Sequence, residues 1–460
     1  MEGKMCHVKE GGSWQVIVAG GGPAGCAAAI ASAREGKRTL LIEETSALGG
    51  MGTMGLVPWW CTDACFCPPE QSVYQGIAGK IIGRCSEYSL KMPTDEFPDP
   101  KISPEALKRI YDEEVTAAGA QVLFQTRLCD VDAEDSCIRS VLVANRDGLS
   151  CLHADVFVDA TGDGDLSVQS GAQAKYGRDG QKLQSATCCF SMTNVDTWGY
   201  EYALGQRMNN GNLATMREQP EKIASKLCLD PELDLIGDGH FCNVMIGAGT
   251  VGFNAGHIED VRPLDPFWVS ESLMKGRQIA HQFERGLRKY APEGFGNAWL
   301  AQTGALLGIR ESRRIVCDYM LTIQDYVKRR SFADEIGRTK YMVDIHRSVK
   351  EQEEGGKNPE EVYRACGPKE SVGIPYRSLL PKGIKNLLVA GRCIGSDALA
   401  NGSIRVMPVC LVTGEAAGQA AALAVEQGGN TRKTDLCVLQ KKLEEYGACL
   451  HAKNEGSDDT

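Results

Sequence analysis

Clusters of basic side chains are missing from this chain of 460 residues. It contains 50 Lys and Arg against 60 Asp and Glu, which gives a formal net charge of −10, and its densest basic run is only Lys328–Arg330. Proteins that hold nucleic acid gather Lys and Arg against the phosphates. The composition therefore predicts that nucleic acid is not a partner.

Long apolar runs are missing as well. The longest apolar segment, residues 16–33, is interrupted by four glycines and by Pro23. Because a membrane-spanning helix needs about 20 consecutive apolar residues, no membrane span is predicted. Residues 1–13 are polar and lack the pattern of a signal peptide. A long chain of this kind with 19 cysteines is expected to keep them as reduced thiols in the cytoplasm.

Glycine, in contrast, is abundant. The chain has 52 glycines, above the average share of roughly 7%, and they gather in a few loops. Glycine lets backbone approach a ligand closely, so these loops indicate a large cofactor that carries phosphate. The length exceeds the roughly 250–300 residues at which one hydrophobic core stops growing, which predicts more than one domain.

A dinucleotide-binding pattern lies near the start of the chain. The run Val16–Ala19 predicts a buried parallel strand, Cys26–Arg34 predicts a helix, and Thr39–Ile42 predicts a second strand. A G-x-G-x-x-G loop precedes the helix, and two acids follow the second strand. The candidate cofactor-binding residues of this unit are Gly20, Gly22, Pro23, Ala24, Gly25, Glu43 and Glu44.

Each part of this unit has a physical task. Gly20 permits the tight turn out of the strand, Gly22 lets backbone N–H groups approach a diphosphate, and Gly25 allows the helix to pack closely on the sheet. The positive end of the helix dipole stabilises the phosphates. Glu43 can accept hydrogen bonds from an adenosine ribose and disfavours a 2′-phosphate, so NADP is not expected here.

Three later segments favour FAD over NAD. A second glycine-rich stretch follows the acids, where a one-nucleotide dehydrogenase would continue into a helix. Two further apolar strands, Val156–Asp159 and Leu387–Ala390, end in small-residue turns, and such strand ends face the ligand crevice of a parallel sheet. The candidate cofactor contacts in these segments are Gly50, Met51, Gly52, Thr53, Ala160, Thr161, Gly162, Asp163, Gly391 and Arg392.

A second G-x-G-x-x-G match, Gly247–Gly252, lacks the context of a nucleotide site. The following residues contain Pro263 and Pro266 and show no helical periodicity. No second strand with a terminal acid comes soon after it. We interpret this segment as a glycine-rich β-turn and predict no separate nicotinamide site.

Later blocks of the sequence resemble those of the FAD-dependent oxidoreductase family. That family belongs to the two-dinucleotide-binding-fold superfamily, which also includes the fumarate-reductase-type flavoproteins. The resembling blocks, within a likeness that covers residues 14–428, are Gly308–Arg314, Asp344–His346, Ile374–Pro381 and Ser403–Pro408.

The resemblance implies FAD as the cofactor. It places Val406, Met407 and the start of the helix Val409–Gln427 against the flavin pyrimidine ring. Many relatives carry a histidine shortly before the Ser-Ile-Arg block. This chain has Gly395–Gly402 there, so it does without that histidine or uses Asp397.

The expected fold class is α/β. A Rossmann-like FAD-binding domain with a parallel central sheet would comprise residues 14–190 and 372–430. An inserted α+β substrate domain would comprise residues 191–371. A C-terminal helix and a disordered tail would complete the chain over residues 431–460.

The candidate catalytic residues lie in or near the expected insertion. Arg310, Arg313 and Arg314 are expected on one helix, where a guanidinium could clamp a substrate oxyanion, pair with Glu311 or Asp318, or contact FAD phosphates. His257 and His346 are candidates for a general acid or base, although each could equally be a structural histidine. Of these residues, His257, Arg310 and His346 are predicted to be catalytic.

Three cysteines, Cys61, Cys65 and Cys67, are closely spaced. They could form a redox pair, a covalent flavin tether or a metal site, but ordinary thiols are favoured. A zinc site would need a second ligand pair, and the ferredoxin spacing is absent. No metal site is therefore predicted.

The leading hypothesis is a dehydrogenase or reductase that transfers hydride between flavin N5 and a small polar organic substrate. The alternative is a flavoprotein subunit that passes electrons to an iron–sulfur or other redox partner protein. A third, weaker possibility is a flavin-binding protein without turnover.

Overall fold

The largest sheet has seven strands in the order β3-β2-β1-β6-β5-β4, with β15 paired to the end of β6. The computed structural model describes residues 7–62, 72–88, 100–178, 182–208, 219–354, 357 and 359–450. The strands of this sheet are β1 (Val8–Ala19), β2 (Thr39–Ile42), β3 (Gln121–Leu123), β4 (Arg127–Glu134), β5 (Cys137–Asn145), β6 (Gly148–Asp159) and β15 (Leu387–Val389).

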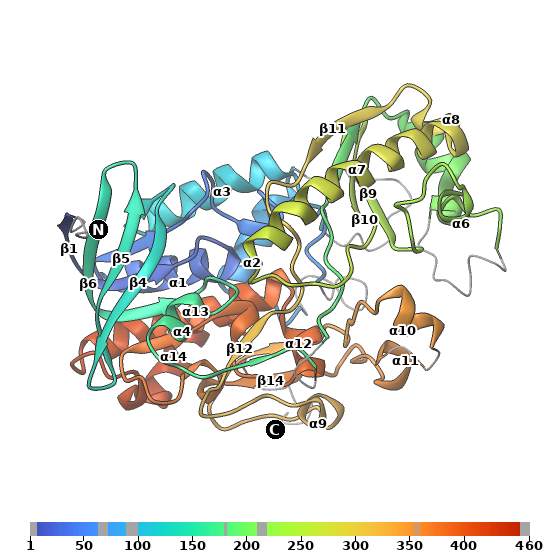
Figure 1. Ribbon diagram of the computed structural model, residues 1–460. Helices are drawn as coiled ribbons and strands as arrows, with labels where there is room; N and C mark the ends of the chain where they lie inside the picture. Colours follow the sequence, from blue (N-terminus) through green and yellow to red (C-terminus); the bar gives the residue numbers. More distant parts are fainter. Residues whose placement is uncertain are drawn as a thin grey trace.

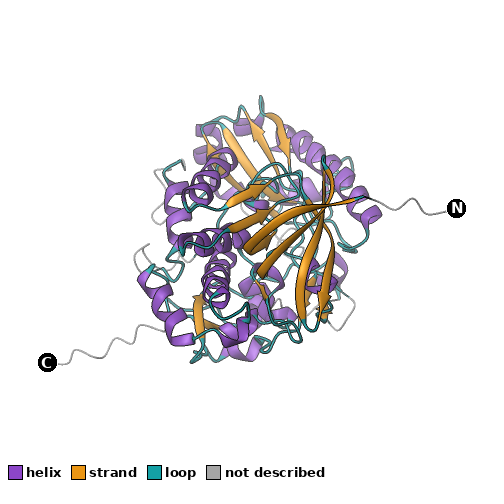
Figure 2. Ribbon diagram, turned by 90° about the vertical axis from the view of Figure 1, so that its left-hand side faces the viewer, coloured by secondary structure: helices purple, strands orange, loops and turns teal. Residues whose placement is uncertain are grey.

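The sheet has a parallel half and an antiparallel half. Strands β1, β2, β3, β6 and β15 are parallel, whereas β5 runs antiparallel to both β6 and β4. In Figure 2 the long strands fan out in the foreground and helices flank them. The α/β class with a parallel central sheet is confirmed, as are the predicted strands.

Strand β1 is longer than its apolar run. Its buried part begins at Val16, but the strand starts at Val8, and the exposed half pairs with β6 from Leu149 onward. Backbone hydrogen bonds stabilise this half, so hydrophobic periodicity could not predict it.

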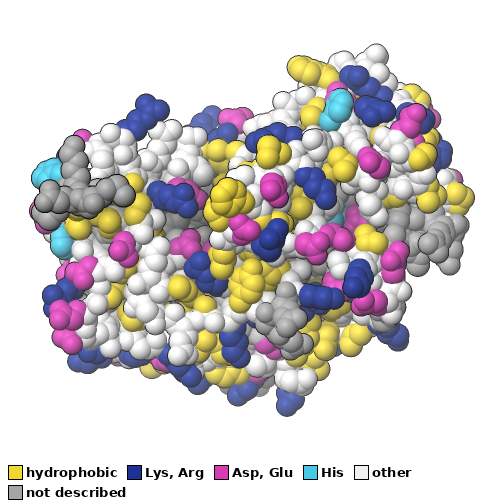
Figure 3. Space-filling view, viewed as in Figure 1, with side chains coloured by type: hydrophobic (Ala, Val, Ile, Leu, Met, Phe, Trp, Pro, Cys, Tyr) yellow, Lys and Arg dark blue, Asp and Glu magenta, His cyan; other side chains and the backbone are white. Residues whose placement is uncertain are grey.

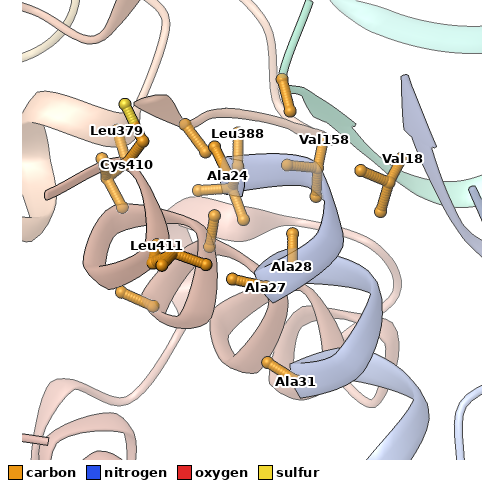
Figure 4. Close-up of a cluster of buried hydrophobic side chains, with 14 of the residues drawn as sticks. Val18, Ala24, Ala27, Ala28, Ala31, Val158, Leu379, Leu388, Cys410 and Leu411 are labelled. Atoms are coloured by element: carbon orange, nitrogen blue, oxygen red, sulfur yellow. The ribbon is translucent and has the colours of Figure 1, made fainter. Parts of the chain in front are cut away.

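Helices α1 (Pro23–Arg34) and α13 (Met407–Val425) cross each other against the sheet. Figure 4 shows the alanines of α1 facing Cys410 and Leu411 of α13, with Val18, Val158 and Leu388 of the sheet beside them. The two helices approach so closely because the contact is made by glycine. A Cβ at Gly414 would lie 2.1 Å from the carbonyl oxygen of Ala24, and a Cβ at Gly418 would lie 2.1 Å from that of Ala28.

Helix α13 is apolar and long enough to cross a membrane, but 89% of its most apolar window is buried inside the protein. It packs on α1 and also contacts α2 (Ile77–Ser86), α14 (Leu436–Glu445) and β6. This helix is therefore part of the hydrophobic core.

A second sheet forms the lobe at the upper right of Figure 1. It is antiparallel in the order β11-β8-β10-β9, and the long helix α7 (Pro266–Tyr290) packs on it. Its strands are β8 (Phe190–Thr193), β9 (Phe241–Gly247), β10 (Thr250–Ala255) and β11 (Trp299–Thr303). This is the expected inserted α+β unit.

The buried side chains divide into two main cores. The core of the second sheet spans Ala186 to Leu307, whereas Ile315, Leu321 and Ile336 pack in the core of the large sheet. The domain limits stay a prediction, but this packing favours an insertion that ends before residue 371.

Shorter elements connect these parts. Two small sheets pair β7 (Ala174–Tyr176) with β12 (Arg313–Ile315) and β13 (Glu335–Thr339) with β14 (Val372–Pro375). The remaining helices of the described residues are α3 (Pro104–Ala117), α4 (Asp165–Gln169), α6 (Ile223–Leu229), α8 (Pro292–Phe295), α9 (Ile323–Val327), α10 (Val349–Glu353), α11 (Pro359–Val362) and α12 (Ala398–Ile404).

Two sequence interpretations are settled by these elements. The second glycine match is the turn of the β9–β10 hairpin, in which Gly247 pairs with Thr250, so the β-turn prediction is confirmed. Helix α14 is the predicted C-terminal helix, while the predicted tail over residues 451–460 lies outside the described residues.

The surface of the face seen in Figure 1 carries acidic and basic side chains mixed with each other (Figure 3). No extended basic patch stands out on this face. This distribution agrees with the absence of basic clusters from the sequence and with a formal net charge of −10.

The glycine contact between α1 and α13 leads to a stability prediction. Gly418→Ala is expected to destabilise the protein by about 1–3 kcal/mol, because overpacking forces backbone and side chains apart. Gly83→Ala is the matched control, since Gly83 lies in α2 and a Cβ there would meet nothing within 4 Å; it should be neutral or stabilise by about 0.5–1 kcal/mol. Urea and thermal unfolding of both variants measure the difference, and equal shifts would contradict the glycine contact.

Candidate functional site

A cavity of about 1190 Å³ opens at the carboxyl ends of β1, β2, β6 and β15 and reaches the second sheet. Parallel α/β sheets bind ligands at this edge. The volume exceeds the roughly 300–1,000 Å³ of an ordinary ligand pocket, which leaves space for a cofactor and a second molecule.

The glycines of the first loop have the geometry that their tasks require. Gly20 has φ +97°, and a Cβ there would lie 2.5 Å from the carbonyl oxygen of Ala160. A Cβ at Gly25 would lie 1.7 Å from the carbonyl oxygen of Gly20, so α1 rests directly on the strand end. Gly22 lines the cavity, and a Cβ there would meet nothing within 4 Å. The backbone at Gly22 is thus open to a ligand.

Glu43 orders this loop. Its carboxylate accepts hydrogen bonds of 2.7 Å from the backbone N–H groups of Gly21 and Thr45. Each oxygen keeps a second lone pair, and the residue lines the cavity, where a ribose hydroxyl could donate to it. Glu44 also lines the cavity, 3.8 Å from Nε of Arg127.

Asp159, at the end of β6, holds the next turn. This fully buried carboxylate accepts four hydrogen bonds, from the N–H and hydroxyl groups of Thr161 and of Ser167. Beyond that turn, Arg392 donates to Asp163 at 2.8 Å. The two strand ends β6 and β15 are thereby tied together at the cavity.

Two helix N-termini point to the same cavity. Pro23 and Ala24 of α1 and Val406 and Met407 of α13 line it, and no side chain caps either helix. Uncapped N–H groups and the positive helix end form an anion site. This donor set fits a cofactor with phosphates at one end and a ring that takes up negative charge at the other, as FAD has.

Most of the predicted cofactor contacts line this cavity. They are Gly20, Gly22, Pro23, Ala24, Glu43, Glu44, Gly50, Met51, Ala160, Thr161, Gly162, Asp163, Gly391, Arg392, Val406 and Met407. Gly25, Gly52 and Thr53 do not line it: Gly25 packs on β1, a Cβ at Gly52 would lie 2.9 Å from Leu107, and Thr53 donates to the carbonyl of Leu48 at 2.6 Å. Direct contacts of all these residues with FAD stay predictions.

The three arginines of residues 308–314 do not share a helix, so that expectation was wrong. Residues 308–312 have no regular structure, and Arg313 begins strand β12. Spacings of three and four mimic a helix, but Gly308 is held in a bridge to Thr187 and β12 pairs with β7. Extended backbone sends the three side chains in different directions.

Arg310 reaches into the cavity and is 8% exposed. Its guanidinium donates to the carbonyl of Ser185 at 2.6 Å, to Oγ1 of Thr187 at 2.9 Å and to Oδ1 of Asn254 at 3.3 Å. Burial lowers the pKa of Arg310 to about 10, so the group is still protonated at neutral pH.

His257 and His346 meet in the same part of the cavity. Nε2 of His257 lies 2.9 Å from Nδ1 of His346. The outer nitrogens are both held by carboxylates: Nδ1 of His257 by Asp238, and Nε2 of His346 by Asp344 at 3.2 Å. Burial lowers the pKa of His346 to about 3. Because no ring nitrogen of this pair is left over for a substrate proton, their predicted acid–base roles stay predictions.

Further residues complete this polar end, and sequence reasoning missed them. The ring of His240 stacks on that of His257, with centroids 4.1 Å apart, and Arg405 donates to Asp344 at 2.9 Å. Burial opposes ionisation of Asp344, but His346 and Arg405 lower its pKa. The signal that could have identified His240 is scarcity, since the chain has only 7 histidines.

Two sequence hypotheses concern single side chains. Asp397 is the N-cap of α12, accepting from the N–H of Ala400 at 2.7 Å, and it is not among the residues that line the cavity. Cys61 lines the cavity, whereas Cys65 and Cys67 lie outside the described residues, so the role of the three cysteines stays a prediction.

Comparison with known proteins identifies one family. The model of the family described as "FAD dependent oxidoreductase" matches residues 15–443. No curated protein matches the sequence.

Several solved structures are similar to this chain at low identity. They include a geranylgeranyl bacteriochlorophyll reductase-like protein from Thermoplasma acidophilum, with 14% identity, a TM-score of 0.45, and coverage of 95% of this chain and 84% of that one. The p-nitrophenol 4-monooxygenase of Pseudomonas putida has 11% identity and a TM-score of 0.47, covering 95% and 87%. A myxobacterial chondrochloren halogenase has 14% identity and a TM-score of 0.44, covering 94% and 79%. At these values the likeness carries no argument about substrate or reaction.

The Asp159 network leads to a prediction about cofactor affinity. Asp159→Ala removes the acceptor of four hydrogen bonds that order the turn after β6, and leaving buried donors unpaired costs about 1–3 kcal/mol each. We expect FAD to bind the variant at least roughly tenfold more weakly, which corresponds to about 1.4 kcal/mol. Asp147→Ala, at an exposed carboxylate that pairs with Lys9, is the control. Titration of FAD into the two apoproteins measures the difference; equal affinities would contradict a role for the turn.

Proposed function

Because the chain belongs to the family of FAD-dependent oxidoreductases, we propose that it transfers a hydride between FAD and a small polar organic substrate that carries a carboxylate or another oxyanion. The observation that carries this proposal is the buried cation of Arg310 in the cavity. Its hydrogen-bond partners among the described residues are all uncharged.

The neighbouring arginines make a useful contrast. Arg313 pairs with Asp165 at 3.0 Å and Arg314 pairs with Glu311 at 2.7 Å. A buried charge is costly unless an opposite charge compensates it. Of the three arginines, only Arg310 lacks a carboxylate within salt-bridge distance in the described part of the chain. Asp344 acts on Arg310 only from farther away, so an anionic substrate can supply the close partner.

The protein positions Arg310 before the substrate arrives. The carbonyl of Ser185 and the hydroxyl of Thr187 hold one terminal nitrogen, and Asn254 on β10 holds the other. A guanidinium fixed in this way can bind an oxyanion with two parallel hydrogen bonds. Orientation of this kind is the main contribution of a protein to hydride transfer by a bound cofactor.

FAD, when bound, supplies flavin N5 as the hydride donor or acceptor. The positive end of α13, at Val406 and Met407, stabilises negative charge on the ring system and so favours the reduced state. The open backbone at Gly22 and the N-terminus of α1 bind the diphosphate. Kinship with the fumarate-reductase-type flavoproteins stays a prediction.

The electron-transfer alternative is not favoured. A subunit that only passes electrons to a partner has no need of a polar chamber next to its cofactor. Here the cavity continues from the glycine loop to Arg310, His257 and His346, which suits a small-molecule substrate.

The proposal predicts a preference for anionic substrates. Organic acids with an oxidisable C–H bond are added anaerobically to the FAD-loaded protein, and the loss of oxidised-flavin absorbance is followed. The uncharged amide of each acid is tested in parallel. In the opposite direction, pre-reduced protein is mixed with unsaturated or keto acids and reoxidation of the flavin is followed. Acids should react and their amides should not. Arg310→Met should lower kcat/KM roughly 10–100-fold, because a charged hydrogen-bonded pair worth about 1.5–3 kcal/mol is lost.

Arg285→Met is the matched control, since Arg285 lies on the outer helix α7 with its side chain 51% exposed. It should retain both the flavin spectrum and kcat/KM. Amides that react as fast as acids, or an Arg310→Met variant with unchanged kcat/KM, would exclude the oxyanion. A chain that binds no FAD would exclude the reaction itself.

A further inference from the structure

The two carboxylates beside His257 and His346 create an unusual contact between the rings. Asp238 accepts a hydrogen from Nδ1 of His257, and Asp344 accepts one from Nε2 of His346. A neutral imidazole carries one N–H, so the other nitrogen of each ring then presents a lone pair. These two nitrogens face each other at 2.9 Å. Two lone pairs repel at this distance, and a positive charge between or beside them removes the repulsion.

We propose that His240, His257 and His346 bind a divalent first-row transition-metal ion in the cavity. One ring nitrogen from each histidine lies within 4.8 Å of those of the other two. Neutral imidazole is a preferred ligand of Zn²⁺, Fe²⁺, Co²⁺ and related ions. An ion bound at about 2.0–2.1 Å holds tetrahedral ligands roughly 3.3 Å apart, so the facing pair widens slightly and His240 moves inward.

His240 distinguishes two hypotheses for this cluster: a bound metal ion, or a proton shared between His257 and His346. A proton between the facing nitrogens needs only His257 and His346. The ring of His240 nevertheless stacks on His257 and meets the ring of His346 edge-on, with centroids 4.9 Å apart. Its Nδ1 atom is buried and has no hydrogen-bond partner among the described residues. A buried imidazole nitrogen without a partner is costly, and a metal ion bound through Nδ1 would supply one, since Nε2 lies 3.9 Å from Sγ of Cys242.

Asp238 and Asp344 lie where carboxylates commonly hydrogen-bond to the histidine ligands of a metal ion. Histidine ligands of metals usually donate their second N–H to a carboxylate or carbonyl, which fixes the tautomer and raises the basicity of the ligating nitrogen. Asp238 and Asp344 do this for His257 and His346.

Two arginines near the histidines carry positive charge, which disfavours a metal ion here. Their charge also indicates that the remaining metal ligand is an anion. Arg405 pairs with Asp344, and Arg310 faces the cavity with no carboxylate within salt-bridge distance among the described residues. Three protein ligands leave an open coordination position, as in catalytic zinc sites. An oxygen of an anionic small molecule can occupy that position and neutralise Arg310 as well. The expected ligand class is therefore an oxyanion that bridges the metal ion and Arg310.

Metal binding is tested on the FAD-loaded full chain, without any assay of turnover. The protein is treated with a chelator, loaded with Zn²⁺, desalted and analysed for zinc and flavin. We expect about one zinc ion per chain, and His240→Ala and His346→Ala should bind Zn²⁺ at least roughly tenfold more weakly. Asp238→Asn should weaken Zn²⁺ binding roughly 10–100-fold, the usual effect of removing an outer-shell partner.

His281→Ala is the matched control, because His281 lies on the outer helix α7 with its side chain 63% exposed and its Nδ1 atom 3.2 Å from Oε2 of Glu284. It leaves every cysteine in place, so zinc held by thiols would be equal in all variants. Circular dichroism and flavin content establish that each variant is folded. X-ray absorption at the zinc edge should show nitrogen and oxygen neighbours.

Three results would overturn the proposal. One is a folded protein that retains no zinc. Another is a zinc affinity that is the same in His240→Ala, His346→Ala and His281→Ala. The third is loss of zinc in His346→Ala but not in His240→Ala, which would remove His240 from the ligand set and with it the three-histidine site. Because none of these measurements uses a substrate, failure of the metal site leaves the proposed hydride transfer untouched, and the converse also holds.

Discussion

The contact between α1 and α13 is the constraint on which the cofactor cavity depends. Backbone carbonyls of Ala24 and Ala28 lie where side chains at Gly414 and Gly418 would otherwise be. This close crossing fixes the relative position of two helices whose N-termini both line the cavity. We expect one positive helix end to meet the phosphates of FAD and the other to meet its ring system. A wider crossing would change the distance between the two helix N-termini, and with it the span that one cofactor must bridge.

The chemistry of the cavity changes from one end to the other. At the large sheet, the cavity offers a ligand mainly backbone groups, in loops that the buried carboxylates of Glu43 and Asp159 order. At the second sheet they are side chains: a buried guanidinium and a set of imidazoles held by aspartates. Binding through backbone groups suits a cofactor that every member of a family shares, because backbone groups do not change when residues are substituted. Side chains supplied by an insertion can change without disturbing that frame, which is how one fold serves many substrates.

How much the sequence predicted depends on the range of the interactions. The first βαβ unit was predictable because each glycine of its loop is required by local sterics. In the structure, a Cβ at Gly20 or Gly25 would collide with a backbone carbonyl oxygen. The helix expected for Arg310, Arg313 and Arg314 was wrong because spacing alone does not reveal pairing with β7. The contact of His257 with His346 joins residues 89 positions apart. No local pattern encodes such a contact, and the selection of both histidines rested on residue type, not on their proximity.

The order of elements along the chain also has a consequence for biosynthesis. The first βαβ unit is made early, whereas β15 and α13 are made last among the parts of the cavity. Until α13 emerges from the ribosome, the alanine face of α1 has no partner and the cavity lacks its second helix end. The nascent chain must therefore keep an apolar surface soluble during most of its synthesis. The cavity can be complete only after translation has passed Gly418, the last glycine of the α13 contact.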